Sequence, residues 1–77
     1  MLIKKRLRQT IPRKCVIEIM KNNKNNFLQV MEIYLFISEH QRIPLNVIYR
    51  VTRELFDAGV IERRWNEHDG RLTYRLF

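Results

Sequence analysis

Four side chains with hydrogen-bonding groups recur at helical spacing near the middle of the chain. They lie at positions i, i+3, i+4 and i+7 of one predicted helix face: Asn46, Tyr49, Arg50 and Arg53. Arginine can pair with guanine O6 and N7, asparagine with adenine, and tyrosine can contact a thymine methyl group or a phosphate. We therefore predict that these four residues contact base edges in the major groove of a duplex.

The same residues also have a purely structural interpretation. Tyr49 is large enough to be a core aromatic that anchors the helix. Arg50 and Arg53 are spaced to form salt bridges with Glu54 or Asp57 on a solvated face. The residue pattern leaves both interpretations open.

The positive charge is concentrated at the amino-terminal end. The 77 residues carry a formal net charge of +7, and residues 1–24 hold eight basic residues against one acid, Glu18. This distribution indicates an anionic partner, although a solubilising tail would have the same composition.

We predict phosphate contacts from basic residues near the start of the first helix and in the hairpin: Arg8, Arg13, Lys14 and Arg71. Arg71 is equally well explained as an exposed hairpin charge. We also predict that a basic arm within residues 1–9 follows the backbone or enters the minor groove through Lys4, Lys5 and Arg6.

Residues that usually carry catalysis or bind metals are few and scattered. Cys15 is the only cysteine, so neither an intrachain disulfide nor a multi-cysteine zinc site can form. His40 and His68 lack partners at ligand spacing, and Ser38 is the only serine. We predict no enzymatic activity, no metal and no cofactor. Without an apolar run near the roughly 20 residues of a membrane span, or a signal-peptide core, we expect a cytoplasmic protein.

Two helices are predicted in the first half of the chain. The first begins with Thr10 as its cap and Pro12 in its first turn, and it ends in the asparagine-rich residues 22–26. Its apolar stripe consists of Cys15, Val16, Ile19 and Met20. The second helix is expected to follow at once, with a core face made of Phe27, Val30, Met31, Tyr34 and Ile37.

A third helix is predicted with Pro44 in its first turn and Gly59 just beyond its end. Its buried candidates are Ile48, Val51, Leu55 and Ala58. After Gly59 the pattern alternates, which predicts a strand from Val60 to Trp65. A second strand is predicted to have on one side Leu72, Tyr74 and Leu76. Asp69-Gly70 indicates the connecting turn, in a loop longer than two residues, and Trp65 is predicted to pack within the hairpin.

Three helices followed by a hairpin predict an α+β fold of the winged helix-turn-helix type, in a single domain of residues 1–77. The second and third helices would form the helix-turn-helix, and the hairpin would be the wing. The alternative is a generic small α+β domain without a groove-facing helix.

Four stretches of the chain carry a family pattern in order and at the right spacing. They are RQTIPR at residues 8–13, MEIY at 31–34, VIYRVTRELFDAGVIER at 47–63 and DGRLTYRL at 69–76. Together they resemble the DNA-binding half of the ferric uptake regulator family, which includes the zinc uptake and peroxide-stress repressors. The resemblance implies DNA binding, with Tyr49 and Arg50 on the contact surface and basic residues near the start of the first helix on the DNA backbone.

The metal-sensing residues of that family are not matched. Its histidine near the start of the second helix falls at Asn25 or Asn26, and its glutamate at the end of the second wing strand falls at Arg75. A guanidinium group there would repel a cation. With the chain ending at Phe77, the resemblance implies a bare DNA-binding unit without the regulatory metal, of the kind expected in a virus or mobile element.

We therefore predict a sequence-specific transcription regulator that binds double-stranded DNA. Its recognition helix spans about residues 44–58, and two copies are expected to bind a palindrome as a homodimer. Two other functions fit the sequence: a winged-helix module that blocks a host regulator or polymerase, and a non-specific nucleic-acid binder.

Overall fold

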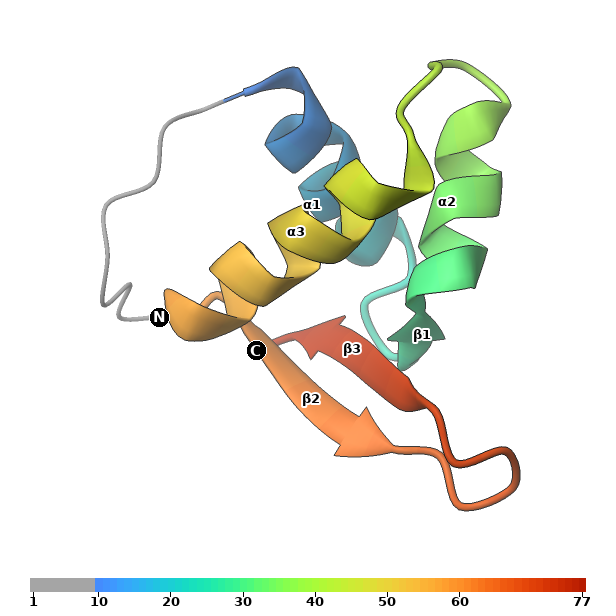
Figure 1. Cartoon of the computed structure of the whole chain (residues 1–77). Coiled ribbons are helices and arrows are strands. Elements are labelled where there is room, and N and C mark those ends of the chain that lie inside the picture. Colours follow the sequence, from blue (N-terminus) through green and yellow to red (C-terminus); the bar gives the residue numbers. More distant parts are fainter. Residues whose placement is uncertain (1–9) are drawn as a thin grey trace.

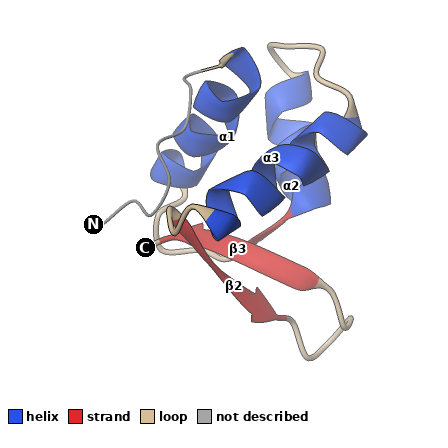
Figure 2. Ribbon diagram, turned by 60° about the vertical axis from the view of Figure 1, so that its left-hand side comes forward, coloured by secondary structure: helices blue, strands red, loops and turns tan. Residues whose placement is uncertain are grey.

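Three helices lie on one side of a small antiparallel sheet in the computed structural model, which describes residues 10–77 (Figure 1). The elements in chain order are α1 (Ile11–Asn22), β1 (Leu28–Gln29), α2 (Val30–Ser38), α3 (Leu45–Asp57), β2 (Ile61–Trp65) and β3 (Leu72–Leu76). Figure 2 shows the same arrangement from another side, with the β2–β3 hairpin extending beyond the helices. The predicted α+β winged helix-turn-helix order is confirmed, with β1 as an additional strand.

Helix α1 begins where the sequence predicts. The Thr10 hydroxyl accepts a hydrogen bond from the Arg13 backbone N–H at 3.3 Å, and Pro12 lies in the first turn. A proline is tolerated there because its missing N–H would have no partner within the helix. The predicted apolar stripe is confirmed, with two residues buried and two partly buried: Val16, Met20, Cys15 and Ile19.

Helix α2 starts later than predicted, and this changes which residues face the core. Leu28 and Gln29 pair with β3, so Phe27 precedes the helix instead of lying on its inner face. The inward residues of the helix are Val30, Ile33 and Ile37. Met31 is 39% exposed, and its predicted core position is wrong. Because α2 is apolar around most of its circumference, its period alone does not identify the inner face.

Helix α3 has the predicted buried face. Its core residues are Ile48, Val51 and Leu55, with Ala58 buried just beyond the last turn. Pro44 stands immediately before the helix, one residue earlier than predicted. Gly59 has a φ of 78°, a left-handed conformation that glycine adopts without steric cost, and it ends the helix as expected.

The sheet has the strand order β1-β3-β2, so the last strand of the chain is the central one. β2 pairs with β3 from Ile61 opposite Leu76 to Trp65 opposite Leu72. Residues 66–71 connect them, and the Asn66 carbonyl oxygen accepts the Gly70 N–H at 2.8 Å. The loop is longer than two residues, as predicted.

The core lies between the helical layer and the sheet. Ile61 and Tyr74 are buried from the sheet side. They share a face because Ile61 pairs with Leu76, and Leu76 lies two residues from Tyr74 on β3. The Gln29 side-chain amide donates to the Asp69 carboxylate at 2.7 Å, which ties β1 to the hairpin loop. The hairpin is therefore fixed both to the core and to the chain segment that precedes α2.

Candidate nucleic-acid interface

The outward face of α3 presents the four predicted base-contacting residues to solvent. All four are exposed: Asn46, Tyr49, Arg50 and Arg53. Tyr49 is 51% exposed, so it is not the core aromatic that the sequence also allowed. Helix α3 runs across the front of the helical layer in Figure 1, where no other element covers it. The four side chains are therefore accessible to a ligand, and their contact with bases stays a prediction.

The two arginines on this face have no partner within the part of the chain that the structure describes. Glu54 pairs instead with Arg13 of α1, with 3.0 Å between Arg13 Nη2 and Glu54 Oε2. Arg50 and Arg53 therefore do not form the salt bridges with Glu54 that the sequence also allowed. Since no internal carboxylate neutralises them, both guanidinium groups are available to an anionic ligand.

The basic residues near the start of α1 divide into two kinds. Lys14 is exposed. Arg13 has a side chain only 15% exposed and holds α1 against α3 through its ion pair with Glu54. That internal partner competes with the phosphate contact predicted for Arg13. The predicted contacts at Lys4, Lys5, Arg6 and Arg8 lie outside the described residues.

A groove of about 490 Å³ separates α3 from the hairpin. Its lining includes Tyr49 from α3, Met31 from α2, and Trp65 and Arg71 from the hairpin. Trp65 is 63% exposed, so the prediction that it packs within the hairpin is wrong. It is the last residue of β2, an edge strand, and its side chain is not covered there. The alternating pattern identifies the side of the strand but not whether a helix reaches that far, which is why the sequence missed Trp65 as a surface residue.

Arg71 lies at the end of the hairpin loop, directly before β3, and is exposed. Its backbone N–H donates to the Asp69 carboxylate at 3.0 Å, which fixes the backbone of the loop. Its guanidinium group has no ion pair within residues 10–77. The hairpin thus places one unneutralised cation at the rim of the groove beside α3.

A helix-turn-helix with an exposed third helix, followed by a hairpin that flanks it, defines the winged helix class of DNA-binding domain. The chain belongs to the ferric uptake regulator family, whose model matches residues 4–76. Members of this family are regulators and not enzymes.

Known proteins of the family show the same relationship in sequence and in structure. The chain is 30% identical over 71 residues to the ferric uptake regulation protein of Cupriavidus metallidurans, covering 91% of this chain and 49% of that protein. Its structure is similar to that of the Vibrio cholerae ferric uptake regulator, with a TM-score of 0.83 and 26% identity over 92% of this chain and 54% of the other. A zinc-bound manganese uptake regulator gives a TM-score of 0.80 and 26% identity, with 92% and 53% covered. The chain thus spans about half the length of these relatives.

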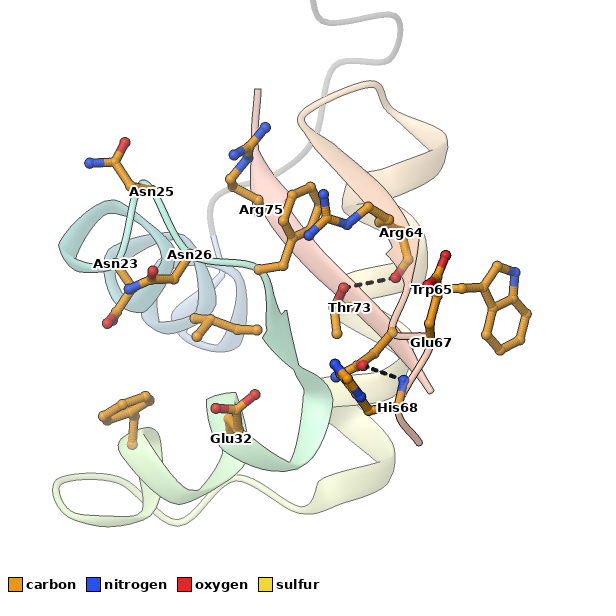
Figure 3. A pocket seen from close by; sticks show the side chains of 14 residues that line it. Asn23, Asn25, Asn26, Glu32, Arg64, Trp65, Glu67, His68, Thr73 and Arg75 are labelled. Carbon is orange, nitrogen blue, oxygen red and sulfur yellow. Dashed lines mark hydrogen bonds between the residues drawn. The ribbon is translucent and has the colours of Figure 1, made fainter. Parts of the chain in front are cut away.

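The opposite face of the sheet is where a family metal site would have to be built. The guanidinium carbons of Arg64 and Arg75 each lie 4.3 Å from the centroid of the Phe27 ring. Arg75 also pairs with Glu62, with 3.2 Å between Nη2 and Oε2. Figure 3 shows both arginines around the same hollow as Asn25 and Asn26.

These residues do not fit a metal ion. Asn25 and Asn26 stand where the family resemblance would place a histidine, and a guanidinium group stands where it would place a carboxylate. Among residues 10–77, no group of three or more His, Cys, Asp or Glu side chains is arranged to hold a cation. Two cations stacked on one aromatic ring instead occupy the position by cation–π contact.

We expect Zn²⁺ and Mn²⁺ to leave the thermal stability of this 77-residue chain unchanged. A metal present at 100 times its Kd would stabilise the folded state by about 2.7 kcal/mol, and each kcal/mol raises Tm by about 4–8 °C in a domain of this size. Thermal unfolding followed by circular dichroism, with either metal and with EDTA, measures the difference. A rise in Tm that saturates at one metal per chain would contradict the conclusion that these residues do not bind a metal ion.

No helix within residues 10–77 has both the length and the apolar character that a membrane span requires.

Proposed function

We propose that this chain is a sequence-specific DNA-binding domain of a transcription regulator, with α3 as its recognition helix in the major groove. The observation that carries the proposal is the outward face of α3, where Tyr49, Arg50 and Arg53 are exposed and neither arginine has a partner among residues 10–77. A side chain must extend freely from the helix to reach a base edge, and these three do. The site acts in the cytoplasm, where the duplex is accessible.

Each residue of this face has a chemical role in base reading. Arg50 donates two hydrogen bonds to guanine O6 and N7, and Asn46 donates to and accepts from adenine. Tyr49 packs on a thymine methyl group, or its hydroxyl donates a hydrogen bond to a phosphate oxygen. Arg53, one turn further along, extends the row to a neighbouring base.

Other basic residues fix the register on the sugar–phosphate backbone. Lys14 contacts a phosphate from α1, and Arg71 contacts one from the tip of the wing. Arg8 adds a third contact, while Lys4, Lys5 and Arg6 follow the backbone or enter the minor groove. We assign Arg13 to the packing of α1 on α3, because Glu54 already satisfies its guanidinium group.

Two copies of the domain bind a palindromic site as a homodimer. One recognition helix reads only a short half-site, and two-fold symmetry of the protein is mirrored in the DNA. The chain's relatives carry names of metal uptake regulators, which supports a role in controlling transcription.

Selection from a library of random duplexes at physiological salt tests the proposal. We expect enrichment of one motif with two inverted half-sites, since base contacts separate specific from non-specific affinity by about 10³ or more. Equal recovery of all duplexes would identify a non-specific nucleic-acid binder. Recovery of no duplex would leave a protein partner as the target of α3.

A further inference from the structure

Trp65 stands exposed at the end of β2 and faces the groove between the hairpin and α3. It lies opposite Leu72 in the hairpin register, whereas Ile61, at the other end of the same strand, is buried. At 63% exposed, it leaves a large apolar surface in water. Tyr49 of the recognition helix lines the same groove. Two exposed aromatics from separate elements therefore converge on one concave surface.

The lining of the groove is chemically complementary to a sugar–phosphate backbone. Its floor is apolar, with Val30, Leu72 and Tyr74 in the lining. Among residues 10–77, Arg71 is the only charged residue that lines it, and no carboxylate does. Deoxyribose presents carbon atoms and phosphate presents negative charge, so an apolar wall beside an unneutralised arginine suits both.

We propose that Trp65 is a direct DNA contact of the wing. Its indole ring packs on the deoxyribose of the strand that passes between α3 and the hairpin, and Nε1–H donates to a phosphate oxygen. A tryptophan suits this position because its ring is apolar and its one donor can stay hydrogen-bonded. The contact is independent of base sequence. This inference rests on the proposed function, since the ligand is the duplex that α3 reads.

Trp65 is the only tryptophan of the chain, so the tryptophan fluorescence reports on this side chain alone. On titration with the selected duplex, we expect its emission to change and its quenching by iodide to fall, in step with the anisotropy of a labelled duplex. Trp65→Ala should weaken selected and random duplexes alike, by about tenfold, which is one contact of ordinary strength. Trp65→Phe keeps an aromatic ring but lacks the N–H donor, so its affinity for DNA should fall by less than that of Trp65→Ala.

Phe77→Ala is the matched control, because Phe77 is 65% exposed and adjoins the opposite end of the hairpin. It should leave both affinities unchanged. Circular dichroism establishes that each variant is folded, and quenching of the wild-type chain tests the proposal even if Trp65→Ala unfolds.

The outcomes separate this inference from the proposed function. If the labelled duplex binds while Trp65 stays equally quenched and Trp65→Ala keeps its affinity, the wing contact is wrong and the recognition helix stands. If no duplex binds, the Trp65 contact and the proposed DNA-binding function are both wrong. If quenching falls with protein concentration in the absence of DNA, a second copy of the chain covers Trp65 and the proposal is overturned.

Discussion

Arg50→Ala is expected to lower affinity for the selected site by about 5- to 150-fold and to leave affinity for unrelated duplexes nearly unchanged. A bidentate contact to guanine contributes about 1–3 kcal/mol of discrimination, which corresponds to that range. The effect should be concentrated at one base pair of each half-site. Competition between the selected duplex and its single-base variants measures it.

Arg50→Lys sharpens this test. Lysine keeps the positive charge but loses the planar pair of donors, so the variant should retain non-specific affinity and lose most of the base preference. Lys24→Ala serves as a charge control, since Lys24 is exposed in the loop after α1 and has no proposed contact. An Arg50→Ala variant that bound the selected duplex as tightly as the wild type would exclude this helix face as the base-reading surface.

Raising the salt concentration from 50 to 200 mM is expected to weaken DNA binding by about 10³-fold for each bound copy of the domain. Each neutralised phosphate contributes a slope of about −0.9 to the plot of log affinity against log salt, and six backbone contacts give a loss of that order. The six proposed contacts are Lys14, Arg71, Arg8, Lys4, Lys5 and Arg6.

Lys14→Ala should reduce the magnitude of this slope by about one and weaken selected and random duplexes equally. The contrast with Arg50→Ala separates backbone contact from base contact within one protein. Fluorescence anisotropy over a salt series provides both quantities. A flat salt dependence would mean that the amino-terminal charge faces solvent and not DNA.

Much of the architecture could be predicted because α3 and the hairpin have strong local patterns. Ile48, Val51 and Leu55 recur at helical spacing, and Gly59 supplies the left-handed residue that ends the helix. β1 could not be predicted, since two residues have no measurable period. Its pairing with β3, over 40 residues away in sequence, draws residues 28–29 out of the helix that Phe27 and Val30 would otherwise begin.

Features of the candidate site that lie within one helix could be predicted from the sequence. Features that depend on how two elements pack together could not. The placement of Tyr49 and Arg50 on one face of α3 follows from the amphipathic pattern of the helix, and the structure shows that this face is exposed. The Arg13–Glu54 ion pair joins residues 41 positions apart, and no local spacing indicates it. Likewise, whether Trp65 is covered depends on where the helical layer ends above the sheet.

The Arg13–Glu54 ion pair has a consequence for the kind of DNA that can be bound. It ties the helix bearing Lys14 to the helix bearing Arg50, so it opposes relative movement of the proposed phosphate contact and the proposed base contact. The spacing between these two contacts is then held fixed. Any mismatch between that spacing and the groove of the duplex must be absorbed by bending or twisting of the DNA. Operators whose intrinsic groove width already matches this fixed span should be favoured, even at base pairs that no side chain touches.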